Sequence, residues 1–250
     1  MATHASVKQS IFERMGVRPV INACGIYTDL GGSILAPGVW SAMEEINSSF
    51  VDMIALLSKS GELIAEMLGA ESARIVPGAS AAITLGTAAC MAGMDGTCWE
   101  RLPDSDGMKN EVVLQKRHRY KYDRCARIAG ASLVEAGSPE RCDITQLLKA
   151  IGPQTAAILF PAHLDGTPGT VSLHDVLSVA RPRGVPVLVD AAYLNYPIES
   201  MRTFTDAGAD LVCFSSKYFG GPNAGGFICG RKTLVDAVAG LDFTRFESGR

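Results

Sequence analysis

From residue 73 onward, short continuous runs of Val, Ile, Leu and Ala alternate with segments that have helical spacing. Such runs are typical of strands covered on both faces, and their alternation with helices is typical of a largely parallel sheet. The sequence therefore predicts an α/β protein with a doubly wound, mostly parallel sheet. The predicted strands are residues 73–76, 111–115, 132–135, 156–160, 186–190, 211–214 and 226–229.

Helical periodicity and end signals define the other elements. Pro37 suits the first turn of a helix, and Gly69 suits the end of one. Residues 96–110 are polar, and we expect a loop there. The predicted helices are residues 6–15, 37–47, 51–68, 80–94, 122–129, 144–151, 173–180 and a last one from residue 233.

Composition narrows the function classes. The chain has 250 residues, 47% of them hydrophobic and 20% charged, which excludes a mostly disordered protein. With 23 basic and 26 acidic residues the net charge is -3, so a dominant basic face for nucleic acid is not expected. No apolar run reaches the roughly 18 to 20 residues that span a membrane, and the first nine residues lack a signal-peptide core. We expect a cytoplasmic protein without membrane contact.

The cysteines give no metal or redox motif. All seven are scattered, and no pair has the C-x-x-C spacing of a zinc or dithiol site. We expect reduced thiols that behave as small hydrophobic residues, and no metal site.

Ligands of open α/β sheets bind beyond the carboxyl ends of the strands, so the residues at those positions are candidates. Gly78, Ala79 and Ser80 follow the first predicted strand, where small residues at a helix start leave N–H groups free for an anion. The alternative is an ordinary tight turn. The ring of His118, in the segment after the second strand, could stack on a flat cofactor, or the segment could be a solvated loop.

Two charged residues also end strands. Asp190 ends an apolar run, where a carboxylate needs a cation or N–H partner such as a protonated pyridine nitrogen; the alternative is a helix N-cap. Lys217 lies between a strand and a Gly-rich loop, where partial burial would make it a nucleophile for carbonyls; the alternative is a surface lysine. An anion turn, a ring, a carboxylate and a lysine are together the parts of a pyridoxal phosphate site.

The sequence resembles the fold-type-I pyridoxal phosphate enzymes. Within them it is similar to the selenocysteine synthase (L-seryl-tRNA(Sec) selenium transferase)-like family, and in it to the D-glucosaminate-6-phosphate ammonia-lyase-like branch. The resemblance runs from about Arg18 to Arg250. It rests on residues 21–25 and 30–32, 50–53, 78–91, 117–119, 188–192 and 210–226 taken together.

The resemblance implies a role for each candidate. Lys217 would be the Schiff-base lysine and Asp190 the partner of the pyridinium, and both would be catalytic. His118 would be the stacking ring. The other expected cofactor contacts are Gly78, Ala79 and Ser80, with Ala192 and Ser215. Asn22, Tyr27 and Thr28 would fall in the segment that lines the substrate mouth.

The sequence departs from the family pattern in three places. Only about twenty residues precede the Asn22 segment, where selenocysteine synthase carries an additional tRNA-binding domain. Residues 193–195 and 218–221 differ from the usual pattern, which leaves the substrate open. The sequence also stops where such enzymes continue into a smaller C-terminal domain. We therefore expect an N-terminal segment, residues 1–50, lining the mouth and a cofactor-binding large domain, residues 51–250, without the C-terminal small domain.

The resemblance favours a pyridoxal phosphate enzyme that deprotonates Cα of a small amino acid or amino-sugar acid and eliminates a β-substituent. Lys217 would be the base. Arg117, Arg119 and Arg124 could bind an anionic substrate, or form a solvated basic loop. The fold type implies a homodimer or higher homo-oligomer. Open alternatives are a selenium transferase on seryl-tRNA, for which the charge balance gives no support, an aldolase or transaminase, and a truncated non-catalytic paralogue.

Overall fold

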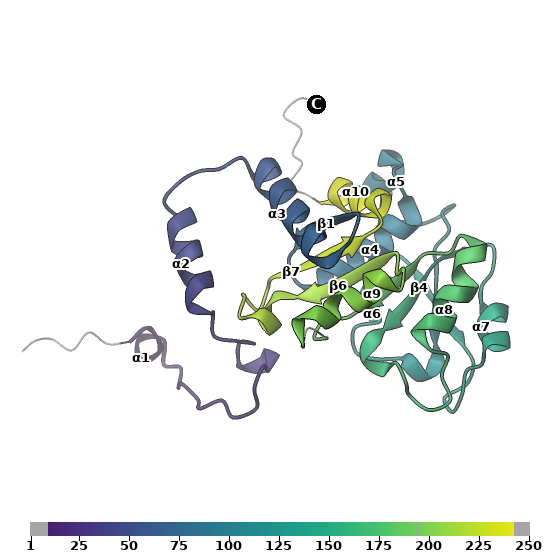
Figure 1. The fold of residues 1–250 in the computed structure, drawn as a ribbon, viewed down its shortest axis with the longest axis horizontal. Coiled ribbons are helices and arrows are strands. Elements are labelled where there is room, and N and C mark those ends of the chain that lie inside the picture. Colours follow the sequence, from purple (N-terminus) through teal and green to yellow (C-terminus); the bar gives the residue numbers. More distant parts are fainter. Residues whose placement is uncertain (1–9, 195, 243–250) are drawn as a thin grey trace, which may run out of the picture.

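The computed structural model describes residues 10–194 and 196–242. Its centre is one seven-stranded sheet with the order β1-β7-β6-β5-β4-β2-β3 (Figure 1). β7 runs antiparallel to β1 and β6, and the remaining neighbours are parallel. The strands are β1 (Ser72–Val76), β2 (Glu111–Gln115), β3 (Ser132–Ala136), β4 (Thr155–Pro161), β5 (Val187–Asp190), β6 (Leu211–Ser215) and β7 (Gly226–Gly230). The predicted doubly wound, mostly parallel sheet is confirmed.

Helices cover both faces of the sheet (Figure 1). The α-helices are α1 (Ile11–Met15), α2 (Pro37–Ile46), α3 (Met53–Leu68), α4 (Ala79–Ala92), α5 (Gly96–Arg101), α6 (Arg124–Ile128), α7 (Ile144–Ala150), α8 (Leu173–Ala180), α9 (Arg202–Asp206) and α10 (Lys232–Leu241). The predicted loop over residues 96–110 is wrong at its start. There Asp95 accepts hydrogen bonds from the N–H groups of Thr97 and Cys98, which caps α5. Residues 6–9 of the first predicted helix lie outside the described residues.

The core has two halves, one on each face of the sheet. α3, α7 and α8 pack on one face, and α4, α6 and α10 pack on the other. The side chains of β5 alternate between the two halves of the core, which explains why the sequence of such a strand is continuously apolar. Val187 and Val189 enter the first half of the core, while Leu188 enters the second. A strand that is covered on both faces has no solvent-facing side, so polar residues do not alternate with apolar ones along it.

The segment before α3, residues 10–52, is called the arm here. It holds α1, η1 (Thr28–Leu30) and α2, and it extends away from the sheet (Figure 1). No residue of α1, η1 or α2 is buried. The arm reaches the rest of the chain near η1, where the N–H of Ala36 donates to the carbonyl of Gly220 at 2.8 Å.

All seven cysteines are free. In the part of the chain that the structure describes, no helix has the length and apolar character needed to cross a membrane.

Candidate active site

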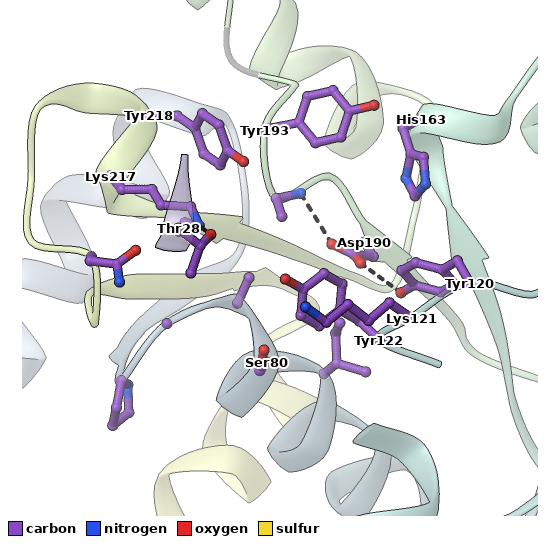
Figure 2. Close-up of a pocket in the computed structure, with 17 residues that line it drawn as sticks. Thr28, Ser80, Tyr120, Lys121, Tyr122, His163, Asp190, Tyr193, Lys217 and Tyr218 are labelled. Carbon is purple, nitrogen blue, oxygen red and sulfur yellow. Dashed lines mark hydrogen bonds between the residues drawn. The ribbon is translucent and has the colours of Figure 1, made fainter. Parts of the chain in front are cut away.

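A cavity of about 480 Å³ opens at the edge of the sheet where β1, β5 and β6 end (Figure 2). This volume is in the range of small-molecule sites, and the position is where α/β sheets bind ligands. The cavity is lined by Thr28, Pro77, Gly78, Ala79, Ser80, Ile83, Tyr120, Lys121, Tyr122, His163, Asp190, Ala192, Tyr193, Ser215, Lys217, Tyr218 and Asn223.

The N-terminus of α4 forms one wall of the cavity. Gly78 is the N-cap residue with φ of +92°, a conformation that favours glycine, and no side chain caps the helix. The first N–H groups of a helix have no partner within it. Those of the first turn, at Ala79 and Ser80, therefore make this wall suited to an anion such as a phosphate.

Asp190 faces the cavity near Tyr120 and is only 4% exposed (Figure 2). Its Oδ2 accepts a hydrogen bond from the Tyr120 hydroxyl at 2.6 Å, and its Oδ1 accepts one from the N–H of Ala192 at 3.1 Å. Burial raises the pKa of this carboxyl, against the opposing effects of the two hydrogen bonds and the charge of His163. Among the described residues, Asp190 forms no ion pair.

Four rings follow one another along the cavity (Figure 2). The ring centroids are 5.3 Å apart for Tyr120 and His163, 5.6 Å for His163 and Tyr193, and 5.9 Å for Tyr193 and Tyr218. Burial, together with the charge of Asp190, raises the pKa of Tyr120, so its hydroxyl stays a donor. Burial also lowers the pKa of His163, which favours a neutral ring. The rings offer flat surfaces for an aromatic ligand.

Lys217 lies in η6 (Ser216–Phe219), directly after β6, and is 9% exposed. Its Nζ donates a hydrogen bond to Thr28 Oγ1 at 2.6 Å and lies 5.4 Å from the centroid of the Tyr218 ring. Burial lowers the pKa of this amine, and the positive charge of Lys121 adds to the effect. A lysine with a lowered pKa is a better nucleophile and base near neutral pH.

Seven of the eight cofactor residues predicted from the sequence line this cavity. They are Gly78, Ala79, Ser80, Asp190, Ala192, Ser215 and Lys217. The structure brings these residues together in one cavity, and their roles toward a cofactor stay predictions.

His118 is the exception, and the prediction of a stacking role for it is corrected. The side chain is 0% exposed and lies outside the cavity, with its ring edge-on to Phe160 at 5.3 Å. Its Nδ1 lies 3.3 Å from the amide nitrogen of Gln115. The turn η2 (Lys116–His118) directs this ring into the core, and the chain then brings Tyr120 to the cavity. Burial lowers the pKa of His118 to about 4.

The three arginines considered for substrate binding also lie outside the cavity. Arg119 pairs with Asp123 and Glu135, and Arg117 donates to the carbonyls of residues 139 and 140. Lys121 is the cation of this segment that lines the cavity.

Of the three mouth residues, Thr28 lines the cavity, whereas Asn22 and Tyr27 do not. Asn22 closes a local turn by accepting from the N–H of Cys24.

Sequence reasoning missed most of the aromatic residues of the site. The rule that identified Asp190 could have found His163, which follows the carboxyl end of β4 by two residues. Tyr193 and Tyr218 each lie close after a predicted residue, but nothing in the sequence distinguishes a tyrosine that faces a cavity from one that faces solvent.

Comparison with known proteins defines the family. A family profile described as L-seryl-tRNA selenium transferase matches residues 20–246. The chain belongs to this family. It is 38% identical over 234 residues to D-glucosaminate-6-phosphate ammonia lyase of Salmonella typhimurium and 36% identical to 5'-C-glycyluridine monooxygenase-decarboxylase of a Streptomyces species, covering 91% and 90% of this chain. An L-seryl-tRNA(Sec) selenium transferase of Moorella thermoacetica is 30% identical over 93% of the chain.

Solved structures agree with this family assignment. The structure of D-glucosaminate-6-phosphate ammonia-lyase superposes with a TM-score of 0.86 and 38% identity, over 94% of this chain and 64% of that one. The Thermus thermophilus aspartate aminotransferase, with a TM-score of 0.58 and 18% identity, shares the fold. The chain therefore has the fold of fold-type-I enzymes. It spans 62%, 57% and 52% of the length of the three relatives named above.

Proposed function

We propose that the protein is a pyridoxal phosphate enzyme that removes the Cα proton of a small amino acid or amino-sugar acid and expels a β-substituent. The observation that carries the proposal is Asp190, a buried carboxylate facing the cavity with two hydrogen bonds and no ion pair among the described residues. Such a carboxylate is costly unless a cation completes its surroundings, and a protonated pyridine nitrogen is a cation of that kind.

The rest of the cavity fits the same cofactor. The first turn of α4 would hold the phosphate with the N–H groups of Ala79 and Ser80, and Ser215 would lie on the same side. Tyr120 or His163 would cover one face of the ring, in the role predicted for His118. Lys217 would bind the carbonyl carbon.

Each residue then has a defined task. Pyridoxal phosphate supplies an electron sink for the carbanion when it is bound. Asp190 keeps the ring nitrogen protonated, and the Tyr120 hydroxyl fixes the direction of Asp190. Lys217 takes the proton from Cα, a task for which the lowered pKa of its amine is suited.

The substrate class follows from the name of one relative and from one residue. The Salmonella relative is named as an ammonia lyase of a phosphorylated amino-sugar acid. Lys121 lines the cavity and, among the described residues, forms no ion pair, so it can meet a carboxylate or phosphate of the substrate.

A selenium transferase acting on seryl-tRNA is the second candidate. The description of the matching family and the name of the Moorella relative favour it. The net charge of -3 gives no surplus of cations for an RNA backbone. Sub-micromolar binding of one tRNA species that survives physiological salt would replace the first proposal by this one.

We also propose how the chain is organised. The arm lines the mouth of the site through Thr28, and the remainder is the cofactor-binding domain. A second copy covers the arm to form a homodimer, because Ile21, Ile34 and Phe50 are fully exposed apolar side chains. The cytoplasm suits the seven free cysteines.

Titration with pyridoxal phosphate tests the cofactor. We expect a new visible absorbance band for the wild type and for Lys121→Ala, and none for Lys217→Ala. Ammonia release from a panel of amino acids and amino-sugar acids, with and without a phosphate group, tests the reaction. A wild type that binds no pyridoxal phosphate would reject the proposal.

A further inference from the structure

One short part of the arm is attached to the body of the protein. Residues 27–36, called the clasp here, pack on the loop that follows Lys217. The Ser33 hydroxyl donates to the carbonyl of Gly221 at 3.0 Å, and the N–H of Ala36 donates to the carbonyl of Gly220 at 2.8 Å. A Cβ atom at Gly32 would lie 2.6 Å from the side-chain oxygen of Asn223, so the two segments approach closely.

The clasp also has an internal framework. Tyr27 and Gly32 exchange backbone hydrogen bonds across a single bridge, and η1 (Thr28–Leu30) lies within it. Thr28 is therefore held at the start of a closed turn whose end is fixed to the loop after Lys217. Its hydroxyl enters the cavity and accepts a hydrogen bond from Lys217 Nζ at 2.6 Å (Figure 2).

Two other groups of the described chain lie near the Lys217 amine. Tyr218 presents a ring to the amine at 5.4 Å, and Lys121 repels it. Among the described residues no carboxylate forms an ion pair with Lys217. In the part of the chain that the structure describes, the Thr28 oxygen accepts the hydrogen bond of this ammonium group.

We infer that Thr28 is a positioning residue for the Lys217 amine. The inference rests on the proposed function, in which Lys217 must leave the cofactor carbon and then accept a proton from Cα. In that interval a flexible four-carbon side chain needs a fixed partner to keep its nitrogen near the reacting atom. Thr28, fixed by the clasp to the loop after Lys217, is that partner.

Competitive labelling of the cofactor-free protein with acetic anhydride measures this contact directly. Peptide mass spectrometry gives the rate at Lys217 relative to the exposed Lys149 as an internal reference. Thr28→Val removes the acceptor and keeps the shape of the side chain. Because a hydrogen bond to a charged group favours the charged form, we expect Lys217 to react about three- to tenfold faster in this variant.

Two variants separate the hydroxyl from the fold of the clasp. Thr28→Ser keeps the hydroxyl and should react at the wild-type rate. Ser33→Ala removes one of the two hydrogen bonds between the clasp and this loop, while the N–H of Ala36 still donates to the carbonyl of Gly220. Thr28 therefore stays in place, and Lys217 should react at the wild-type rate. An unchanged rate in Thr28→Val, a fast rate in Thr28→Ser, or an equal increase in Ser33→Ala would each overturn the inference.

Trapping with pyridoxal phosphate and borohydride on the same samples keeps the two proposals apart. An adduct on Lys217 in both the wild type and Thr28→Val supports the cofactor assignment whatever the labelling rates are. Absence of the adduct from the wild type rejects the proposed function, while the labelling rates still decide whether Thr28 holds the amine.

Discussion

Apolar side chains are buried in the sheet and exposed in the arm. In the sheet, Leu188 on one face of β5 and Val187 and Val189 on the other face are all buried. In the arm, Ile21, Ile34 and Phe50 are fully exposed, and neither α1 nor α2 buries a residue. The body is held by its own core, whereas most of the arm is held by local turns and by the clasp. This difference is the basis of the proposed dimer, in which a second copy would bury the apolar side chains of the arm.

The candidate active site lies where these two regions meet. The end of β5 supplies Asp190, the turn after β6 supplies Lys217, and the arm supplies Thr28. Substitutions in the two regions should therefore differ in kind, and the following predictions are ordered from the largest expected effect to the smallest.

Asp190→Asn, in the body, should have the largest effect. The amide cannot keep a pyridine nitrogen protonated, so we expect turnover to fall by about a thousandfold or more while pyridoxal phosphate still binds. Ammonia release and visible absorbance measure the two effects. Asp206→Asn, at an exposed aspartate outside the cavity, is the matched control and should behave as wild type. Turnover within about tenfold of wild type in Asp190→Asn would remove this residue from the mechanism.

Truncation of one phenylalanine in each region compares how much the two regions contribute to the free energy of unfolding. Phe160 is fully buried, and Phe160→Ala should lower the free energy of unfolding by about 3–5 kcal/mol. Phe50→Ala should change it by less than about 0.5 kcal/mol, because this side chain is exposed within one chain. Urea unfolding at low protein concentration measures both. Equal losses in the two variants would show that the arm is part of the folded core.

A pH titration tests the burial of His118. Its pKa in the folded protein is about 4, below the ordinary value of 6.5, so the unfolded chain takes up this proton first as the pH falls. The contribution of the neutral ring to stability is complete above about pH 6.5 and is lost as the pH falls toward 4, by about 3 kcal/mol. His118→Gln should therefore show a flatter dependence of the unfolding free energy on pH over this window.

The exposed His174 gives the control for that titration. His174→Gln should follow the wild-type pH dependence. If His118→Gln and the wild type had the same slope between pH 6.5 and 4, the ring would be accessible to protons in the folded protein.

The smallest predicted effect concerns assembly. We expect the wild type to be a dimer in light scattering at micromolar concentration. Phe50→Glu and Ile34→Glu should each weaken the dimer by about tenfold or more, since a charge placed in an apolar contact must be desolvated. Leu63→Glu, an exposed position on α3, is the control outside the arm. A wild type that stays monomeric with pyridoxal phosphate present would mean that the arm is covered in another way.

The sequence predicted the fold well because its signals are local. Each predicted strand is present within two residues of its expected ends, since a strand with both faces buried must be apolar throughout. The elements it missed, α5 and α9, are a single turn or slightly longer, and α5 depends on one capping aspartate, Asp95.

The site was predicted in part for the same reason. Asp190 and Lys217 end strands, so a rule about strand ends finds them. The choice between His118 and Tyr120 depends on which way a short turn directs two rings that are two residues apart, and no periodicity encodes that. Thr28 reaches Lys217 across 189 residues of sequence, a contact set by how the clasp docks on the loop at residues 220–223.

The central claim is that Lys217 is the lysine that binds pyridoxal phosphate. Lys121 also lines the cavity, so the identity of the modified lysine is a stringent test of this claim. Borohydride reduction of the protein with pyridoxal phosphate, followed by peptide mass spectrometry, identifies the modified lysine. The account predicts one adduct, on Lys217, that persists in Lys121→Ala and disappears in Lys217→Ala. An adduct on Lys121, or one that remains in Lys217→Ala, would contradict it.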